Sequence, residues 1–202
     1  MKGIRILIAS LLGVTSVAMS TSSLAALALP SGWFIGADVG ASRSNSANYG
    51  ASMSSSGSGF GFDVLGGYKF LPYLAAEVGF NNYAKTSISS GGTRVGQDTH
   101  YSYYFAARGI MPIADSGFDL FAKLGLARLH SKVSATNQPF LAANGLSLRT
   151  GSKSVTGAYL GAGVDYNFSM NLSMELQWTR AKGNSSLGNY DLYSVGVAYL
   201  FE

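Results

Sequence analysis

Cysteine is absent from this chain of 202 residues, and only 12% of its residues are charged. Without cysteine there is no disulfide, no thiol nucleophile and no cysteine-ligated metal. Net charge is low as well: with Lys2 and Arg5 set aside as part of the leader described below, 12 basic residues remain against 10 acidic ones. This balance does not indicate a nucleic-acid partner, and none is predicted.

Long apolar runs are also missing after residue 28, so no transmembrane helix is predicted there. The first 28 residues instead have the pattern of a secretory signal peptide. Lys2 and Arg5 precede the apolar segment 6–19, and Ala26-Leu27-Ala28 fits an A-x-A cleavage site. We predict cleavage after Ala28, with cleavage after Ala25 as the alternative, and one domain over residues 29–202.

The chain is rich in glycine and aromatic residues, and its apolar residues alternate with small or polar ones. A period of two indicates β-strands. Eight alternating segments are separated by connections, and long connections alternate with short ones. The segments are Trp33–Arg43, Gly59–Phe70, Tyr73–Lys85, His100–Met111, Phe118–His130, Ser152–Tyr166, Leu172–Arg180 and a closing strand that begins at Tyr190.

The charged residues of these segments lie on the face opposite the apolar one, and nothing in the sequence predicts a helix that could cover eight apolar faces. If the apolar faces meet lipid and the polar faces fill the interior, a closed ring satisfies every backbone hydrogen bond. The sequence therefore predicts an all-β fold, an eight-stranded antiparallel up-and-down transmembrane β-barrel. A soluble barrel of the lipocalin kind is the alternative, but its outer face would be less apolar.

Six segments, taken in order, resemble the transmembrane domain of the OmpA family. They are GWFIGADVGAS, GFDVLGGYKFLPYLAAEVGF, AARGIMPI, GAGVDYNF, MELQW and SVGVAYLF, and together they extend from Gly32 to Phe201. Because the sequence ends at Glu202, without the periplasmic domain of OmpA itself, it is similar to the free-standing small barrels of the OmpA and OmpX type. The resemblance implies a location in the outer membrane of a Gram-negative bacterium.

The inward-facing charged residues form the first candidate site. They are Asp38, Asp63, Lys69, Glu77, Arg108, Lys123, Asp165 and Glu175. In the OmpA family such residues form a gating ion-pair network, and the resemblance implies that Glu77 is the central glutamate, with Arg108 as its basic partner. It also implies that Asp165 and Glu175 are further acidic members, while the arginine of the family pattern falls on Ser173.

We interpret this interior set as a paired structural plug. Eight strands leave room for side chains and little else, and a buried charge without its partner is costly. A proton path and a narrow gated channel are the alternatives.

Catalytic residues are not predicted, nor are cofactor-binding or metal-binding residues. The sequence has two histidines, of which His100 shares a strand face with Asp98, whereas His130 and its neighbour Ser131 point to opposite faces. No serine motif accompanies Asp98 and His100. We therefore do not expect an enzyme, and a lipid-modifying barrel enzyme is the alternative.

The expected partners follow from the outer surface of the barrel. They are outer-membrane lipid and lipopolysaccharide, whose phosphates Arg128 and Arg180 are placed to contact at the loop end. Solvated loop charges are the alternative for these two arginines. The resemblance implies that the barrel-assembly machinery reads the terminal strand through Tyr193, Val195, Val197, Tyr199 and Phe201. We expect a monomer that supports envelope integrity and presents surface loops for adhesion or contact with a host or the environment.

Overall fold

The structure is a computed structural model that describes residues 31–45, 54–90, 93–114, 116–136, 143, 150–184 and 187–201. These residues form nine strands, which are β1 (Gly32–Asn45), β2 (Ser54–Ser56), β3 (Ser58–Leu71), β4 (Leu74–Ser90), β5 (Thr93–Pro112), β6 (Phe118–Ala135), β7 (Gly151–Asn167), β8 (Leu172–Lys182) and β9 (Asn189–Phe201). Within them, no helix has the length and apolar character needed to cross a membrane. The predicted signal peptide and both of its cleavage sites lie outside the described residues.

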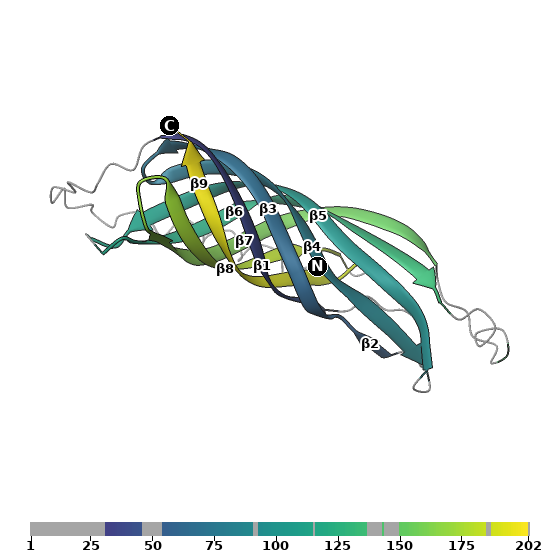
Figure 1. Cartoon of the computed structure of the whole chain (residues 1–202). Coiled ribbons are helices and arrows are strands. Elements are labelled where there is room, and N and C mark those ends of the chain that lie inside the picture. The colour runs from purple at the N-terminus through teal and green to yellow at the C-terminus, as the bar shows by residue number, and fades with distance from the viewer. Residues whose placement is uncertain are drawn as a thin grey trace, which may run out of the picture.

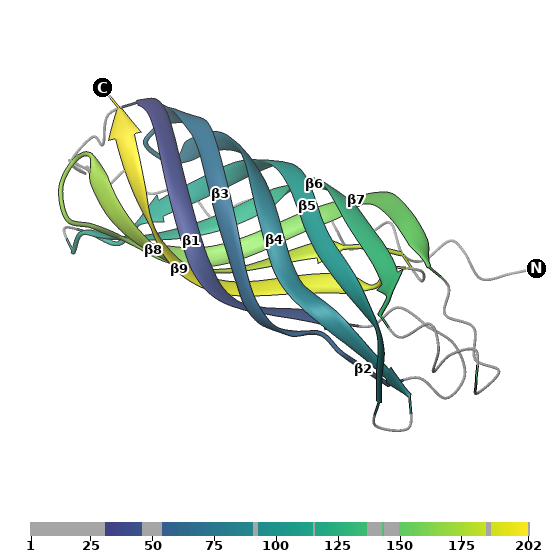
Figure 2. The ribbon, with the colours of Figure 1, turned by 45° about the vertical axis from the view of Figure 1, so that its right-hand side comes forward.

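Eight of the strands close into a ring (Figures 1 and 2). The neighbours run in the order β4-β3-β1-β9-β8-β7-β6-β5, and β5 pairs with β4 again. The last strand closes antiparallel on the first, with Trp33 opposite Phe201 and Ala41 opposite Tyr193. A closed ring leaves no strand edge unpaired, as hydrocarbon requires. The predicted eight-stranded antiparallel up-and-down barrel is therefore confirmed.

The barrel is apolar outside and polar inside. On β6, Leu124 is 65% exposed, whereas its neighbour Lys123 is 2% exposed. Exposed aromatic rings cluster near both ends of the strands, where amphipathic rings prefer the membrane interface. Trp33, Phe70, Tyr73, Phe118, Phe168 and Phe201 are at one end, and Phe60, Tyr103 and Tyr193 are at the other.

Short connections join the strands at one end of the barrel, which we call the turn end; the opposite end is the loop end. At the turn end, Pro72 and Tyr73 link β3 to β4. Gly117, with a positive φ of 76°, lies just before β6, where Ile113 N donates to Phe118 O at 2.8 Å. The C-terminal end of β9 also lies at the turn end, away from the β4–β5 hairpin (Figure 1).

Three strands, β4, β5 and β6, extend well past their predicted ends at the loop end, and β6 continues to Ala135. The stretch Thr86–Thr99, predicted as a polar connection, is mostly strand, because β4 continues to Ser90 and β5 begins at Thr93. The reason is that inward and outward side chains continue to alternate past the apolar band, and the inward Ile88 and Val95 are fully buried. The predicted connection 44–58 likewise contains β2, whose residues pair with Ser87–Ser89 of β4. The barrel wall therefore extends beyond its apolar band at the loop end (Figure 2).

The interior also contains aromatic rings at inward positions of the alternation. Tyr104 stacks on Tyr159 with ring centroids 4.1 Å apart. Inward glycines make room for such rings: a Cβ added to Gly79 would lie 2.5 Å from the Tyr104 ring. The lumen is thus filled by aromatic and charged side chains together.

Candidate functional site in the barrel interior

The strand register places like charges side by side on the inner wall. Arg108 on β5 is opposite Lys123 on β6, and Asp165 on β7 is opposite Glu175 on β8. Like charges in such cross-strand positions repel each other. Each of these charges must therefore be neutralised by an oppositely charged side chain from another part of the lumen.

The two basic side chains, Arg108 and Lys123, contact the carboxylates across the lumen. The Arg108 guanidinium donates from Nη1 to Glu175 Oε2 at 2.7 Å and from Nη2 to Asp165 Oδ2 at 2.5 Å. Lys123 Nζ lies 3.0 Å from Glu77 Oε1 and 3.2 Å from Glu175 Oε1. We call these five residues the ion-pair cluster. Its members come from β4, β5, β6, β7 and β8, so it spans the lumen.

The Glu77–Arg108 contact suggested by the family resemblance is the longest in the cluster. Arg108 Nη1 lies 3.7 Å from Glu77 Oε2, while Lys123 lies closer to that carboxylate. Arg108 also packs its guanidinium on Phe121, with Cζ 3.8 Å from the ring centroid. A cation on an aromatic face gains further stabilisation when it is shielded from water. The arginine is therefore held at short range by two carboxylates and a ring, and Glu77 is its more distant partner.

The remaining predicted interior charges lie outside this cluster. Asp38 and Asp63 are buried and stand opposite each other on β1 and β3. Asp38 Oδ2 accepts a hydrogen bond from Gln177 Nε2 at 3.1 Å, and Asp63 Oδ2 accepts one from Tyr104 at 3.0 Å. Neither carboxylate has a salt bridge among the described residues.

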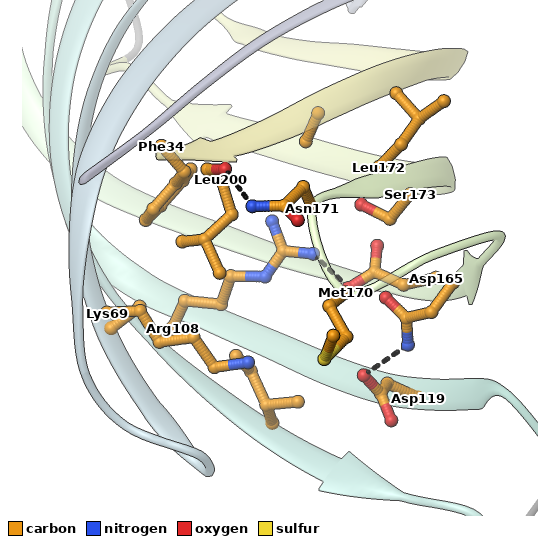
Figure 3. Close-up of a pocket in the computed structure, with 14 residues that line it drawn as sticks. Phe34, Lys69, Arg108, Asp119, Asp165, Met170, Asn171, Leu172, Ser173 and Leu200 are labelled. Atoms are coloured by element: carbon orange, nitrogen blue, oxygen red, sulfur yellow. Dashed lines mark hydrogen bonds and ion pairs between the residues drawn. The ribbon is translucent and has the colours of Figure 1, made fainter. Parts of the chain in front are cut away.

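Lys69 lines a pocket at the turn end, which reaches up to the ion-pair cluster (Figure 3). Arg108 and Asp165 form its inner wall, and Phe34, Ile110 and Leu200 supply an apolar side. Near the mouth, Asn167 Nδ2 donates to Asp119 Oδ2 at 2.9 Å. Ser173, where the family pattern has an arginine, also lines the pocket. The pocket therefore ends at Arg108, whose guanidinium is directed to Asp165 in Figure 3.

A second buried polar group lies in the lumen toward the loop end. Ser131 Oγ lies 2.8 Å from each oxygen of Asp98, so its single hydroxyl hydrogen is donated to this carboxylate, and Asp98 Oδ1 lies 3.6 Å from His100 Nδ1. The His100 ring also contacts Thr86 Oγ1 through Nε2 and Tyr190 through Nδ1, each at 2.9 Å. The serine hydroxyl is thus directed to the carboxylate rather than to the imidazole. A nucleophilic serine needs the imidazole as its base.

His130 and Ser131 point to opposite faces, as the strand period predicts. His130 stacks on Tyr101 on the outer wall, with centroids 4.8 Å apart and ring planes at 10°. Sequence reasoning missed the Ser131–Asp98 contact, because it depends on the register of β5 and β6, in which Ser131 lies opposite His100 and diagonal to Asp98. Across the described segments, no group of three or more His, Cys, Asp or Glu residues could hold a metal ion.

The two outward arginines predicted for lipopolysaccharide differ in their surroundings. Arg128 is exposed on β6. Arg180 is not a free cation, because its Nε donates to Asp191 Oδ1 at 2.7 Å and its Nη2 to Asp191 Oδ2 at 3.0 Å. The residues predicted as the assembly signal all face outward on β9. They are Tyr193, Val195, Val197, Tyr199 and Phe201.

The family model described as "Outer membrane protein beta-barrel domain" matches residues 9–201. The chain belongs to this outer-membrane β-barrel family. Its location is accordingly the cell outer membrane, and its outer wall contacts lipid. The similarity to small OmpA-like barrels expected from the sequence is confirmed.

Individual relatives are distant. Outer membrane protein P5 of Haemophilus influenzae is 29% identical over 91 residues, which are 43% of this chain and 24% of that protein. The chain thus spans about a quarter of the length of this curated relative. Among solved structures, Neisserial surface protein A superimposes with a TM-score of 0.59 at 15% identity, covering 84% of this chain and 97% of that one.

A second similar structure is that of Ail, the attachment invasion locus protein of Yersinia pestis, in complex with the heparin analogue sucrose octasulfate. It has a TM-score of 0.50 at 18% identity and covers 85% of this chain and 97% of that one. At these identities, the two solved structures show the barrel fold alone.

Proposed function

We propose that this outer-membrane barrel is a structural, non-enzymatic protein whose lumen is closed by the ion-pair cluster and whose loop end contacts the cell's surroundings. The observation that carries the proposal is the pair of short contacts from Arg108 to Glu175 and Asp165. They join β5 to β7 and β8 across the lumen, with all three side chains buried. Such a cross-brace ties the barrel wall together and supports the integrity of the envelope.

Surface contact is proposed from the charges of the loop end. Among the described residues, every Asp and Glu is buried, and all of the exposed charged side chains are basic. They are Arg43, Lys85, Arg94, Arg128, Lys132, Lys153 and Lys182, which we call the basic rim. A rim of one sign attracts polyanions such as lipopolysaccharide phosphates or sulfated host polysaccharides. The complex of the similarly folded Ail with a heparin analogue is consistent with this role.

We further propose that residues 1–28 are the leader that exports the chain, that β9 is read by the barrel-assembly machinery, and that the barrel functions as a monomer. An in-cell pulse experiment tests the first two points, since blocked leader cleavage and blocked assembly give products of different size and location.

The decisive test of the main proposal uses the purified full chain in liposomes and in planar bilayers. We expect no lipase or acyltransferase turnover in the wild type or in His100→Ala, and only small, rare conductance steps in the wild type. Turnover that disappears with His100→Ala would replace the structural role with an enzymatic one. Large, stable conductance in the wild type would show that the lumen is open.

A narrow gated channel is the second candidate, and the turn-end pocket favours it. This pocket already leads from the turn end to Arg108, so the ion-pair cluster is the barrier that a conducting state would have to remove. Glu77→Ala should raise conductance if Lys123 must change partners to open the lumen, because Lys123 Nζ lies 3.0 Å from Glu77. An unchanged conductance in Glu77→Ala would mean that the ion-pair cluster serves as a structural plug and not as a gate.

A further inference from the structure

A hollow on the outer wall near the loop end lies between two aromatic side chains. Its lining includes Ala41 and Arg43 of β1, Phe60 of β3 and Tyr193 of β9. In the register, Ala41 is opposite both Phe60 and Tyr193, so the small residue lies between the two rings. Phe60 is 66% exposed and Tyr193 is 56% exposed, which means that both rings project from the wall.

The dimensions of this hollow suit a hydrocarbon chain. Neighbouring strands lie about 4.8 Å apart, so the side chains of β3 and β9, one strand on each side of β1, are separated by roughly 10 Å. After the thickness of the two rings is subtracted, the remaining width is close to that of one acyl chain. Between the two rings the outward residue of β1 is Ala41, whose side chain is a single methyl group.

A cation lies directly on the loop side of the hollow. Arg43 is the next outward residue of β1 after Ala41, and it is exposed. Its cross-strand neighbour on β9 is Asp191. That carboxylate already accepts hydrogen bonds from Trp178 Nε1 at 3.0 Å and from the Arg180 guanidinium at 2.7 and 3.0 Å.

The hydrogen bonds of Asp191 go to β8, so Arg43 and Arg180 share one carboxylate and this part of the outer wall keeps an excess of positive charge. Among the described residues, Arg43 has neither a salt bridge nor a side-chain hydrogen bond. An exposed arginine at the boundary of an apolar surface directs its guanidinium toward the headgroup region. There it can form paired, charge-assisted hydrogen bonds with a phosphate.

We propose that this hollow is a binding site for lipopolysaccharide, in which one acyl chain lies over Ala41 between Phe60 and Tyr193 and a lipid A phosphate binds Arg43. The assignment to lipopolysaccharide rests on the proposed orientation, in which the loop end faces the outer leaflet. Charge supports the choice of an anionic lipid, because two cations, Arg43 and Arg180, flank one carboxylate, Asp191, beside this site. The site is distinct from the basic rim as a whole because it requires the apolar hollow as well as the charge.

The test measures lipid binding to the purified full-length barrel by native mass spectrometry in detergent. The probes are bisphosphorylated lipid A, the same lipid without its phosphates, and phosphatidylglycerol. Arg43→Gln should lower the affinity for bisphosphorylated lipid A about tenfold and leave that for the dephosphorylated lipid unchanged. Ala41→Phe, which fills the hollow, should weaken both lipid A species.

Two matched controls keep the result interpretable. Arg94→Gln removes the same charge from the β4–β5 hairpin and should lower lipid A affinity by much less than Arg43→Gln. Ala107→Phe adds the same ring at an exposed alanine on β5 and should leave lipid A binding unchanged. Equal losses in Arg43→Gln and Arg94→Gln would assign binding to the basic rim and overturn the site. Unchanged binding in both site variants would also overturn it. Tighter binding of phosphatidylglycerol than of lipid A would refute lipopolysaccharide as the occupant, while the structural role tested by conductance and turnover would stand.

Discussion

Replacing Arg108 with methionine should destabilise the barrel by about 3–5 kcal/mol, which is the usual effect of removing one partner from a buried ion pair. The substitution keeps a long side chain that can pack on Phe121 but removes the guanidinium that contacts Glu175 and Asp165. Lys123 still lies 3.2 Å from Glu175, so that carboxylate keeps a cation. Asp165 loses its salt bridge, so the substitution leaves one buried carboxylate without a cation rather than two.

The assay is urea unfolding of the full-length barrel in lipid vesicles, followed by tryptophan fluorescence. Arg128→Met is the control, since Arg128 is exposed on the outer wall, and we expect it to change the free energy of unfolding by at most about 0.5 kcal/mol. The double variant Arg108→Met/Asp165→Asn should recover part of the loss, because the orphaned carboxylate is gone. A loss below about 1 kcal/mol for Arg108→Met, or no recovery in the double variant, would contradict the view that these ion pairs brace the barrel.

Three other predictions concern the wall. Gly79→Val should cost about 1–3 kcal/mol by forcing the Tyr104 ring aside, whereas Gly109→Ala, where an added Cβ meets nothing within 4 Å, should be close to neutral in the same unfolding assay. Leu124→Lys should cost about 2–4 kcal/mol if this outward residue lies at the bilayer midplane, and a cost near zero would place it outside the hydrocarbon. Phe201→Ser should reduce the heat-modifiable, folded fraction recovered from outer membranes in a pulse experiment but not refolding in detergent; equal loss in both would make it a stability residue rather than an assembly signal.

The transmembrane part of the fold could be predicted because lipid imposes a strict rule on the outer face. Every second residue of a strand such as Trp33–Arg43 must be apolar or small, so the period of two is visible without any knowledge of the partner strands. Beyond the apolar band that rule ends, since both faces of β4 and β5 can carry polar residues. The buried Ile88 and Val95 were the remaining signals of strand there, and they were too few to outweigh the surrounding serines and glycines.

The partners within the candidate site were harder to predict than its members. Alternation alone identifies Arg108 and Asp165 as inward residues, but their contact connects β5 to β7 across the lumen. Which side chains meet across a barrel depends on the stagger of the strands, which no single strand encodes. The Arg180–Asp191 pair, in contrast, joins cross-strand neighbours on β8 and β9 and could have been predicted from the register of the two adjacent strands.

The charge distribution shows why a nearly balanced composition says little about the surface of a barrel. The count of 14 basic and 10 acidic residues suggests a protein with weak electrostatic preferences. In the structure, however, the described carboxylates are buried, mostly in the lumen, while the basic rim is exposed at the loop end. Charges inside the wall are partly neutralised by their own partners, and exposed charges at the rim act on whatever approaches it. The outer surface is therefore more basic than the net charge implies, and the anionic partners to test are those of the outer leaflet and of neighbouring cell surfaces.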